Sequence, residues 1–227
     1  LKAEGLEVSV YGVPAYSTLG WMNWAGGDPL LNTFINYPEG ELARMIFHEL
    51  AHQVLYVKDD TLFNESFATA VERLGGARWL AAQASPAARS DYAAFDARRQ
   101  QFRTLALATR TKLRQIYEPN QASAADKYAR VAMKNIAMQE FRDEYARLKT
   151  SWGGYSGYDS WVANANNAAF GAQAAYDELV PGFEALFEAR FERSGASPAQ
   201  QWQHFYDEVK RLADLPPAKR AAALKPS

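Results

Sequence analysis

Two long stretches without glycine or proline constrain the fold of this chain more than any other feature. The first follows Ser85-Pro86 and continues for about thirty residues, up to Glu118-Pro119, and the second runs from Ser123 to about Lys149. Glycine and proline are the residues that most disfavour a helix interior, and Ser-Pro is a typical helix start. We therefore expect two long helices, joined by a short turn and lying antiparallel.

A stripe of aromatic and aliphatic side chains at helical spacing gives each of these helices a face for the other. The residues expected to meet are Tyr92, Phe95, Phe102 and Leu113 on the first helix and Tyr128, Val131, Met138, Tyr145 and Leu148 on the second. We interpret the stripe as core packing.

The first forty residues have a different texture. Val8 to Val13 alternates with β-branched residues and ends at Pro14, and Leu30 to Ile35 is a short apolar run that precedes the turn signal Tyr37-Pro38. Runs of this kind predict two short strands.

From Glu41 onward the apolar residues recur at spacings of three and four, which predicts helices. One is expected from about Glu41 to Val57, and the next from about Asn64 to Leu80. Gly75-Gly76 is a weak point inside the second helix, because glycine disfavours helix interiors.

Composition excludes several classes of function. The 227 residues carry a formal net charge of −1, which gives no electrostatic reason to expect nucleic acid as a partner. There are no cysteines, so thiolate metal sites and cysteine nucleophiles are excluded. No stretch approaches the roughly 18 apolar residues of a membrane-spanning helix.

The segment His48-Glu49-Leu50-Ala51-His52 is the strongest chemical signal. On a helix, residues four apart lie on the same face, so both imidazoles can reach one ion. Two imidazole ligands leave room on zinc for a third ligand and a water. Glu49 follows the first ligand, where its carboxylate can act as general base.

A third protein ligand is expected shortly downstream. Glu65 stands at the start of the next expected helix, and Glu72 is seven residues later, so both project from nearly the same face. One carboxylate can bind the metal while the other hydrogen-bonds a ligating histidine. The pattern by itself favours neither order.

A family resemblance assigns different roles to Glu65 and Glu72. His48 to Gln53 and Asn64 to Ala68 resemble the paired zinc motifs of the aminopeptidase N family, which are gluzincin-type zinc peptidases. The resemblance implies that Glu65 is the third zinc ligand and that Glu72 is a supporting residue in the same helix. Twelve residues separate His52 from Glu65, fewer than in aminopeptidase N, and the Gly-x-Met-Glu-Asn segment of that family is missing.

A second resemblance covers nearly the whole chain. The chain is similar to a bacterial "predicted aminopeptidase" family at Ala15 to Trp21, Phe47 to Gln53, Phe63 to Glu72, Asn166 to Ala168, Tyr176 and Val180 to Phe183. Members of that family often carry a lipoprotein-type signal and a longer N-terminal part. The resemblance implies a bacterial protein that is exported to the periplasm or anchored as a lipoprotein, although this chain carries no signal.

Peptide hydrolysis also needs a donor for the developing oxyanion, and aminopeptidase N relatives use a downstream tyrosine. The candidates are Tyr155 and Tyr158 in a glycine-rich loop and Tyr176 in a later helical run, and we rank Tyr158 and Tyr176 equally ahead of Tyr155. Asn166 and Asn167 are candidates for binding the substrate main chain, with capping of the following helix as the alternative.

The expected fold class is mainly α with a small N-terminal β element (α+β), with a gluzincin-like catalytic core and a long antiparallel hairpin. We expect the zinc-binding core at residues 1–84, the hairpin at 85–150, a helical part that completes the active-site cleft at 151–218, and a frayed tail at 219–227.

The expected function is hydrolysis of a peptide substrate by an aminopeptidase-like enzyme with one Zn²⁺ per chain. One alternative is an endopeptidase or a specific processing protease with the same chemistry. The other is an inactive helical binding protein in which the zinc is structural, which Glu72 as a fourth ligand would support.

Overall fold

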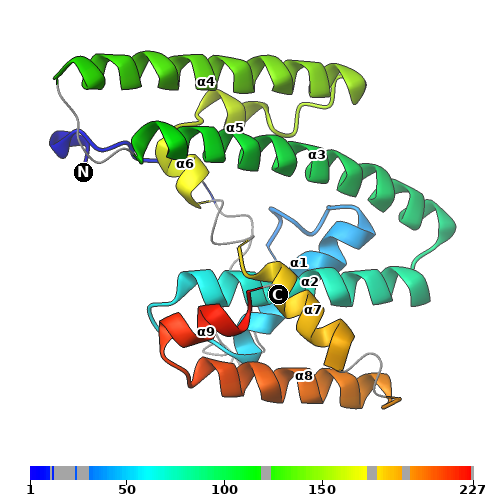
Figure 1. Cartoon of the computed structure of the whole chain (residues 1–227). Coiled ribbons are helices and arrows are strands. Elements are labelled where there is room, and N and C mark those ends of the chain that lie inside the picture. Colours follow the sequence, from blue (N-terminus) through cyan, green and yellow to red (C-terminus); the bar gives the residue numbers. More distant parts are fainter. Residues whose placement is uncertain are drawn as a thin grey trace. The chain divides into compact units, whose positions relative to one another are not determined.

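The computed structural model describes residues 1–10, 12, 24, 31–118, 124–172, 178–190 and 195–225, and its regular structure is helical (Figure 1). The elements are η1 (Lys2–Glu4), α1 (Glu39–Val54), α2 (Thr61–Ala82), α3 (Pro86–Tyr117), α4 (Ala124–Ser151), α5 (Asp159–Ala163), α6 (Asn167–Ala172), α7 (Val180–Arg190), α8 (Pro198–Ala213) and α9 (Pro217–Ala223). They form two compact units: unit 1 is Leu1–Tyr11 with Ala93–Gln173, and unit 2 is Gly12–Tyr92 with Ala174–Ser227.

The expectation of a small N-terminal β element, and with it an α+β core, is wrong: the described residues contain no strand. Residues 32–36 form successive turns, with the backbone nitrogens of Phe34 and Ile35 both donating to the carbonyl of Leu31. Residues 8–10 have no regular secondary structure, and no strand pairs with them in the described part of the chain. A short apolar run does not by itself distinguish a strand from other buried structure, and a strand needs a neighbour for its backbone hydrogen bonds.

Unit 2 consists of helices packed around a core that is rich in aromatic side chains. Helix α2 packs along α1 and against α7, and α8 and α9 complete the unit. The α2 face toward α7 and α8 carries Phe63 and Phe67, which are 1% and 0% exposed. The ring of Phe63 meets Phe183 of α7 edge-on, with centroids 5.3 Å apart. Burial of these rings on both partners fixes α2 in the middle of the unit.

The pair Gly75-Gly76, expected as a weak point, lies inside an unbroken α2. A Cβ at Gly75 would lie 3.3 Å from the ring of Phe47, and one at Gly76 would lie 2.6 Å from Cγ of Arg44. Both neighbours belong to α1. The two glycines therefore let α1 and α2 approach closely, and this packing offsets their poor helix propensity.

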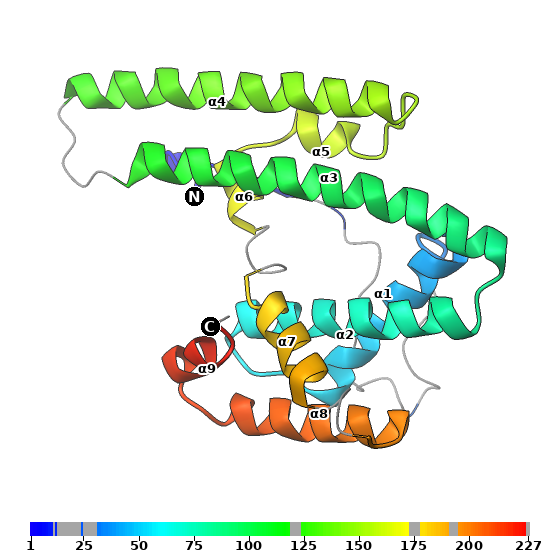
Figure 2. The same ribbon diagram turned by 45° about the vertical axis from the view of Figure 1, so that its right-hand side comes forward.

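Unit 1 contains the antiparallel helical hairpin. The indole of Trp152, just after α4, donates to Gln101 of α3, whereas Lys112 further along α3 pairs with Glu140 earlier in α4. Such reversed pairing defines an antiparallel arrangement, which both views show (Figures 1 and 2).

Only part of the expected stripe forms the hairpin core. Phe102, Leu113, Met138 and Tyr145 are buried there, together with side chains of α5 and the residues around α6. Tyr128 and Val131, which we expected in the interface, are 79% and 52% exposed.

Among the described residues no helix is both long enough and apolar enough to cross a membrane.

The chain from residue 219 was expected to be a frayed tail, but residues 217–223 form α9, which packs within unit 2. Arg220 is 5% exposed, forms an ion pair with Asp60 and donates to the carbonyl of Ala213 at 2.8 Å. Leu224 is 2% exposed and belongs to the aromatic core. Among the apolar residues of this segment, Leu224 is buried, whereas Ala222 and Ala223 are exposed.

Docking of α9 predicts that Leu224→Ala lowers the free energy of unfolding of unit 2. Truncation of a buried leucine leaves a cavity, and we expect a loss of about 2–4 kcal/mol, measured by urea denaturation. Lys219→Ala, on the exposed side of the same helix, is the control and should change stability by less than about 0.5 kcal/mol. Equal stability of the two variants would show that α9 is not packed in solution.

Candidate metal centre

The two histidines of the His-Glu-x-x-His segment lie one turn apart on the last half of α1. Helix α1 begins with Glu39 and Glu41 in its first turn, where carboxylates suit the positive end of the helix dipole, and it ends at Val54. The rings of His48 and His52 meet edge-on, with centroids 5.1 Å apart. The four-residue spacing thus puts both imidazoles on one side of the helix.

The connection to α2 is held by side chains that clamp the backbone. Asn64 is 1% exposed; its Oδ1 accepts from the Val57 nitrogen at 2.8 Å, and its Nδ2 donates to the Val57 carbonyl at 2.7 Å. Asp60 caps α2 by accepting from the Phe63 nitrogen at 3.1 Å. These bonds fix the start of α2 against the end of α1, and Glu65 is the next residue after the clamp.

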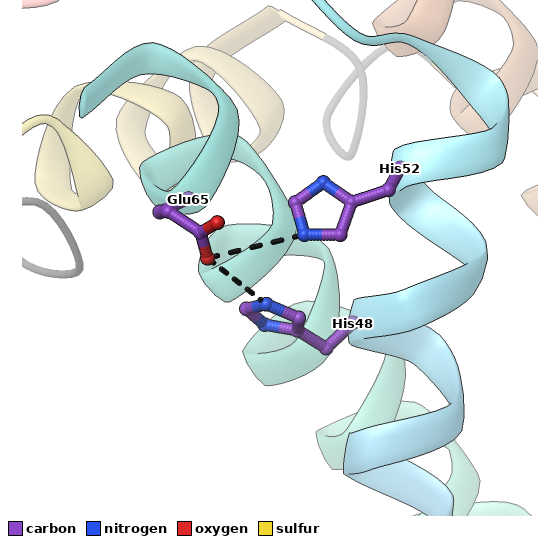
Figure 3. A group of neighbouring side chains, drawn as sticks. All are labelled: His48, His52 and Glu65. Atoms are coloured by element: carbon purple, nitrogen blue, oxygen red, sulfur yellow. Dashed lines mark ion pairs between the residues drawn. The ribbon is translucent and has the colours of Figure 1, made fainter. Parts of the chain in front are cut away.

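Glu65 meets both histidines (Figure 3). Its Oε2 lies 3.3 Å from Nε2 of His48 and 3.9 Å from Nε2 of His52. Among the described residues, His48, His52 and Glu65 form a group able to hold a metal ion, with one ligand atom from each lying within 4.8 Å of the others. Ligands at ~2.0–2.2 Å from a tetrahedral zinc are separated by roughly 3.3–3.6 Å, so the group fits zinc after small side-chain adjustments.

Glu72 approaches His48 from the other side of its ring. Its Oε2 lies 3.1 Å from Nδ1 of His48, and its Oε1 forms an ion pair with the Arg44 guanidinium. An ionised carboxylate can only accept, so Nδ1 of His48 must carry the proton in this bond. In the neutral imidazole the lone pair is then on Nε2, the atom that faces Glu65.

The charges around the site shift three pKa values. Burial lowers the pKa of His48, but the hydrogen bonds that it donates to Glu65 and Glu72, together with their charges, outweigh burial and raise the pKa from 6.5 to about 9. Burial and the neighbouring His48 lower the pKa of His52. Burial raises the pKa of Glu72, but the bond to His48 and the charge of Arg44 reverse this and hold it below its usual value. The raised pKa of His48 favours its protonated form at neutral pH when no cation is bound.

The remaining candidate residues have different surroundings. Glu49, the expected general base, follows His48 on α1 and is partly buried. Tyr176 lies outside the described residues. The ring of Tyr158 belongs to unit 1, where it stacks on Phe102 with centroids 4.0 Å apart, so packing accounts for it. Its role as oxyanion donor stays a prediction.

The two asparagines also lie in unit 1, whereas the metal group lies in unit 2. Oδ1 of Asn166 accepts from the Ala169 nitrogen at 3.0 Å, which caps α6, and its Nδ2 donates to the carbonyl of Val8 at 3.0 Å. The backbone nitrogen of Asn167 donates to Glu7 at 2.7 Å. The alternative of helix capping therefore describes Asn166, and substrate binding by this pair stays a prediction.

Three residues of the site's surroundings were not recognised in the sequence: Arg44, Asn64 and Tyr92. Arg44 is 4% exposed and donates to the Tyr92 hydroxyl at 2.8 Å. The signal available for Arg44 was its position four residues before His48, hence on the same helix face, with Glu72 expected nearby. Asn64 belongs to the segment that resembles a zinc motif, but nothing in the sequence indicated its hydrogen bonds to Val57.

The chain matches the family described as "Putative aminopeptidase" over residues 1–224. This match covers nearly all of the sequence, so the chain belongs to that family. No curated protein and no solved structure matches it.

The pKa of His48 predicts how the stability of the metal-free protein depends on pH. A pKa that folding raises from 6.5 to about 9 contributes stability that is complete below pH 6.5 and is lost as the pH rises through about 9. In chelator-treated protein we expect the free energy of unfolding to fall by up to about 3 kcal/mol between these values. The lowered pKa of His52 acts below this window.

The measurement is urea denaturation at several pH values, with His48→Gln as the control that removes the titrating group. The variant should show a much shallower dependence between pH 6.5 and 9 than the wild type. The same slope in both proteins would contradict the assignment to His48.

Proposed function

We propose that this chain hydrolyses peptide bonds, with one zinc ion held by His48, His52 and Glu65 and with Glu49 as the general base. One observation carries the proposal: a single oxygen of Glu65 lies 3.3 Å and 3.9 Å from the Nε2 atoms of the two histidines. Two imidazoles and a carboxylate are the donor set of catalytic zinc sites in peptidases. Membership of the "Putative aminopeptidase" family supports the same reaction class.

Each side chain of the site has a separate role in the proposed hydrolysis. His48, His52 and Glu65 would hold the zinc, which would supply polarisation of the scissile carbonyl and a lower pKa for the attacking water. Glu49 takes the proton from that water and returns it to the leaving amine, as general base and then general acid. Glu72 keeps the Nδ1 proton of His48 in place, so that Nε2 remains a ligand atom.

The family description and the likeness to aminopeptidase N motifs favour cleavage at a free N-terminus over internal cleavage. An endopeptidase would use the same ligands and the same base. An aminopeptidase and an endopeptidase therefore differ in whether the site must bind the free N-terminus of the substrate. Peptides with free and blocked N-termini distinguish the two activities.

A helical binding protein with a structural zinc is the second candidate. A structural zinc is normally closed by four protein ligands, for which Glu72 was the expected fourth. Both oxygens of Glu72 have other partners, His48 Nδ1 and Arg44. The engagement of Glu72 favours a site with three protein ligands, which leaves a position open for chemistry.

Elemental analysis of purified protein tests the ligand set. We expect about one zinc per chain in the wild type and a clear loss in Glu65→Ala, because two imidazoles alone hold zinc weakly. The control Glu188→Ala removes an exposed carboxylate on α7 and should retain the zinc. A well-folded wild type that takes up no zinc, even with metal added, would overturn both the zinc peptidase and the structural zinc.

Glu49→Gln should keep its zinc while turnover of a peptide falls by roughly 10²–10⁴-fold, since the variant cannot accept the proton of water. Turnover is measured on one peptide with a free N-terminus and on its acetylated copy. The control Glu39→Gln changes an exposed carboxylate at the start of α1 and should retain activity.

Each result of this assay has one meaning. Cleavage of the free peptide alone identifies an aminopeptidase, and cleavage of both copies identifies an endopeptidase. Near wild-type turnover by zinc-loaded Glu49→Gln would remove Glu49 as the base.

A further inference from the structure

We propose that Arg44 is a positioning residue for the metal site: it holds Glu72 in the orientation in which that carboxylate fixes the ring of His48. The inference rests on the proposed zinc site and assigns to it a support that begins at Tyr92. All the residues involved belong to unit 2.

The guanidinium of Arg44 contacts several neighbouring side chains. One terminal nitrogen forms the ion pair with Oε1 of Glu72, and the other donates to the Tyr92 hydroxyl at 2.8 Å and lies 3.8 Å from Glu41. The guanidinium carbon also lies 5.7 Å from the centre of the Tyr92 ring. A planar guanidinium held at both ends presents its donors in a fixed direction, so it can orient a carboxylate.

Burial of this ion pair needs a reason beyond stability. The side chains of Arg44 and Glu72 are 5% and 16% exposed, so most of their hydration is lost. The cost of removing two charges from water can exceed their mutual attraction, and apolar residues of similar size are often as stabilising. The second oxygen of Glu72 supplies the reason, because it contacts a proposed zinc ligand at 3.1 Å.

Two glycines make room for this support. A Cβ at Gly76 would lie 2.6 Å from Cγ of Arg44, and a Cβ at Gly40 would lie 2.5 Å from Cδ2 of the Tyr92 ring. Gly76 lies in the interior of α2, where glycine is worse than alanine by about 1 kcal/mol, and Gly40 lies in the first turn of α1. The space they leave is filled by the arginine and by the tyrosine that holds it.

The contacts form one line from Tyr92 through Arg44 and Glu72 to His48. Without Arg44, Oε1 of Glu72 loses its cationic partner and the carboxylate is free to rotate about its side chain. His48 would then lose the fixed hydrogen bond at Nδ1 that directs Nε2 toward the ion. Loss of such an outer hydrogen bond typically weakens metal binding by 10–100-fold.

The experiment measures the zinc Kd by competition with a chromogenic chelator, in the wild type, Arg44→Met and Tyr92→Phe. We expect Arg44→Met to raise the Kd by about 10–100-fold. Tyr92→Phe removes one hydroxyl and should raise the Kd by a smaller factor, in the same direction. Circular dichroism and thermal unfolding establish that each variant is folded.

Arg78→Met is the matched control for the loss of a partly buried arginine. Arg78 lies on α2, donates to Gln201 at 2.9 Å and stacks over Phe187, on the side of α2 that faces α8. Its removal should lower the melting temperature and leave the zinc Kd unchanged. If Arg44 contributed to stability alone, Arg44→Met would behave like Arg78→Met, with a lower melting temperature and an unchanged zinc Kd.

The outcomes separate this inference from the proposed function. Failure of the wild type to bind zinc overturns the metal site itself. Tight binding by the wild type with an unchanged Kd in folded Arg44→Met, or an equal rise in Arg78→Met, overturns only the positioning role. If Arg44→Met does not fold, an unchanged Kd in Tyr92→Phe overturns it.

Discussion

The close packing of α1 on α2 is the constraint on which the candidate site depends. Helix α1 contributes His48 and His52, and α2 contributes Glu65 and Glu72, two turns apart on one face. The ring of His48 lies between the two carboxylates, 3.3 Å from one and 3.1 Å from the other. A shift of either helix along its axis would break both contacts together. The geometry of the proposed ligands therefore depends directly on the register between α1 and α2.

The sequence was enough to predict that the side chains of His48, His52 and Glu65 lie close together, because each of them obeys a local rule. A four-residue spacing on a helix put His48 and His52 on one face, and a seven-residue spacing did the same for Glu65 and Glu72. What the sequence left open was the order of the two carboxylates, which depends on how far α2 slides along α1. That distance is set by the Asn64 clamp on Val57, a tertiary contact that leaves no periodic signal.

Other expectations failed where a local pattern had two structural solutions. The apolar run at Leu30 to Ile35 suited a strand, but its described part forms turns that bury Phe34 and expose Ile35. Tyr92 fitted the stripe of the hairpin by spacing, but its hydroxyl serves Arg44 of α1. Periodicity shows that a side chain lies on a given face of its helix, and the identity of the neighbour on that face comes from packing.

The ion pair between Arg220 and Asp60 joins two segments that are 160 residues apart in the chain. Asp60 caps α2 one turn before Glu65, so the segment that carries the third proposed ligand receives one of its partners from the last helix. During synthesis on the ribosome, α1 and α2 emerge long before Arg220 does. The N-terminus of α2 therefore acquires its full set of contacts only after Arg220 has been made, and the order of synthesis delays completion of the candidate site until then.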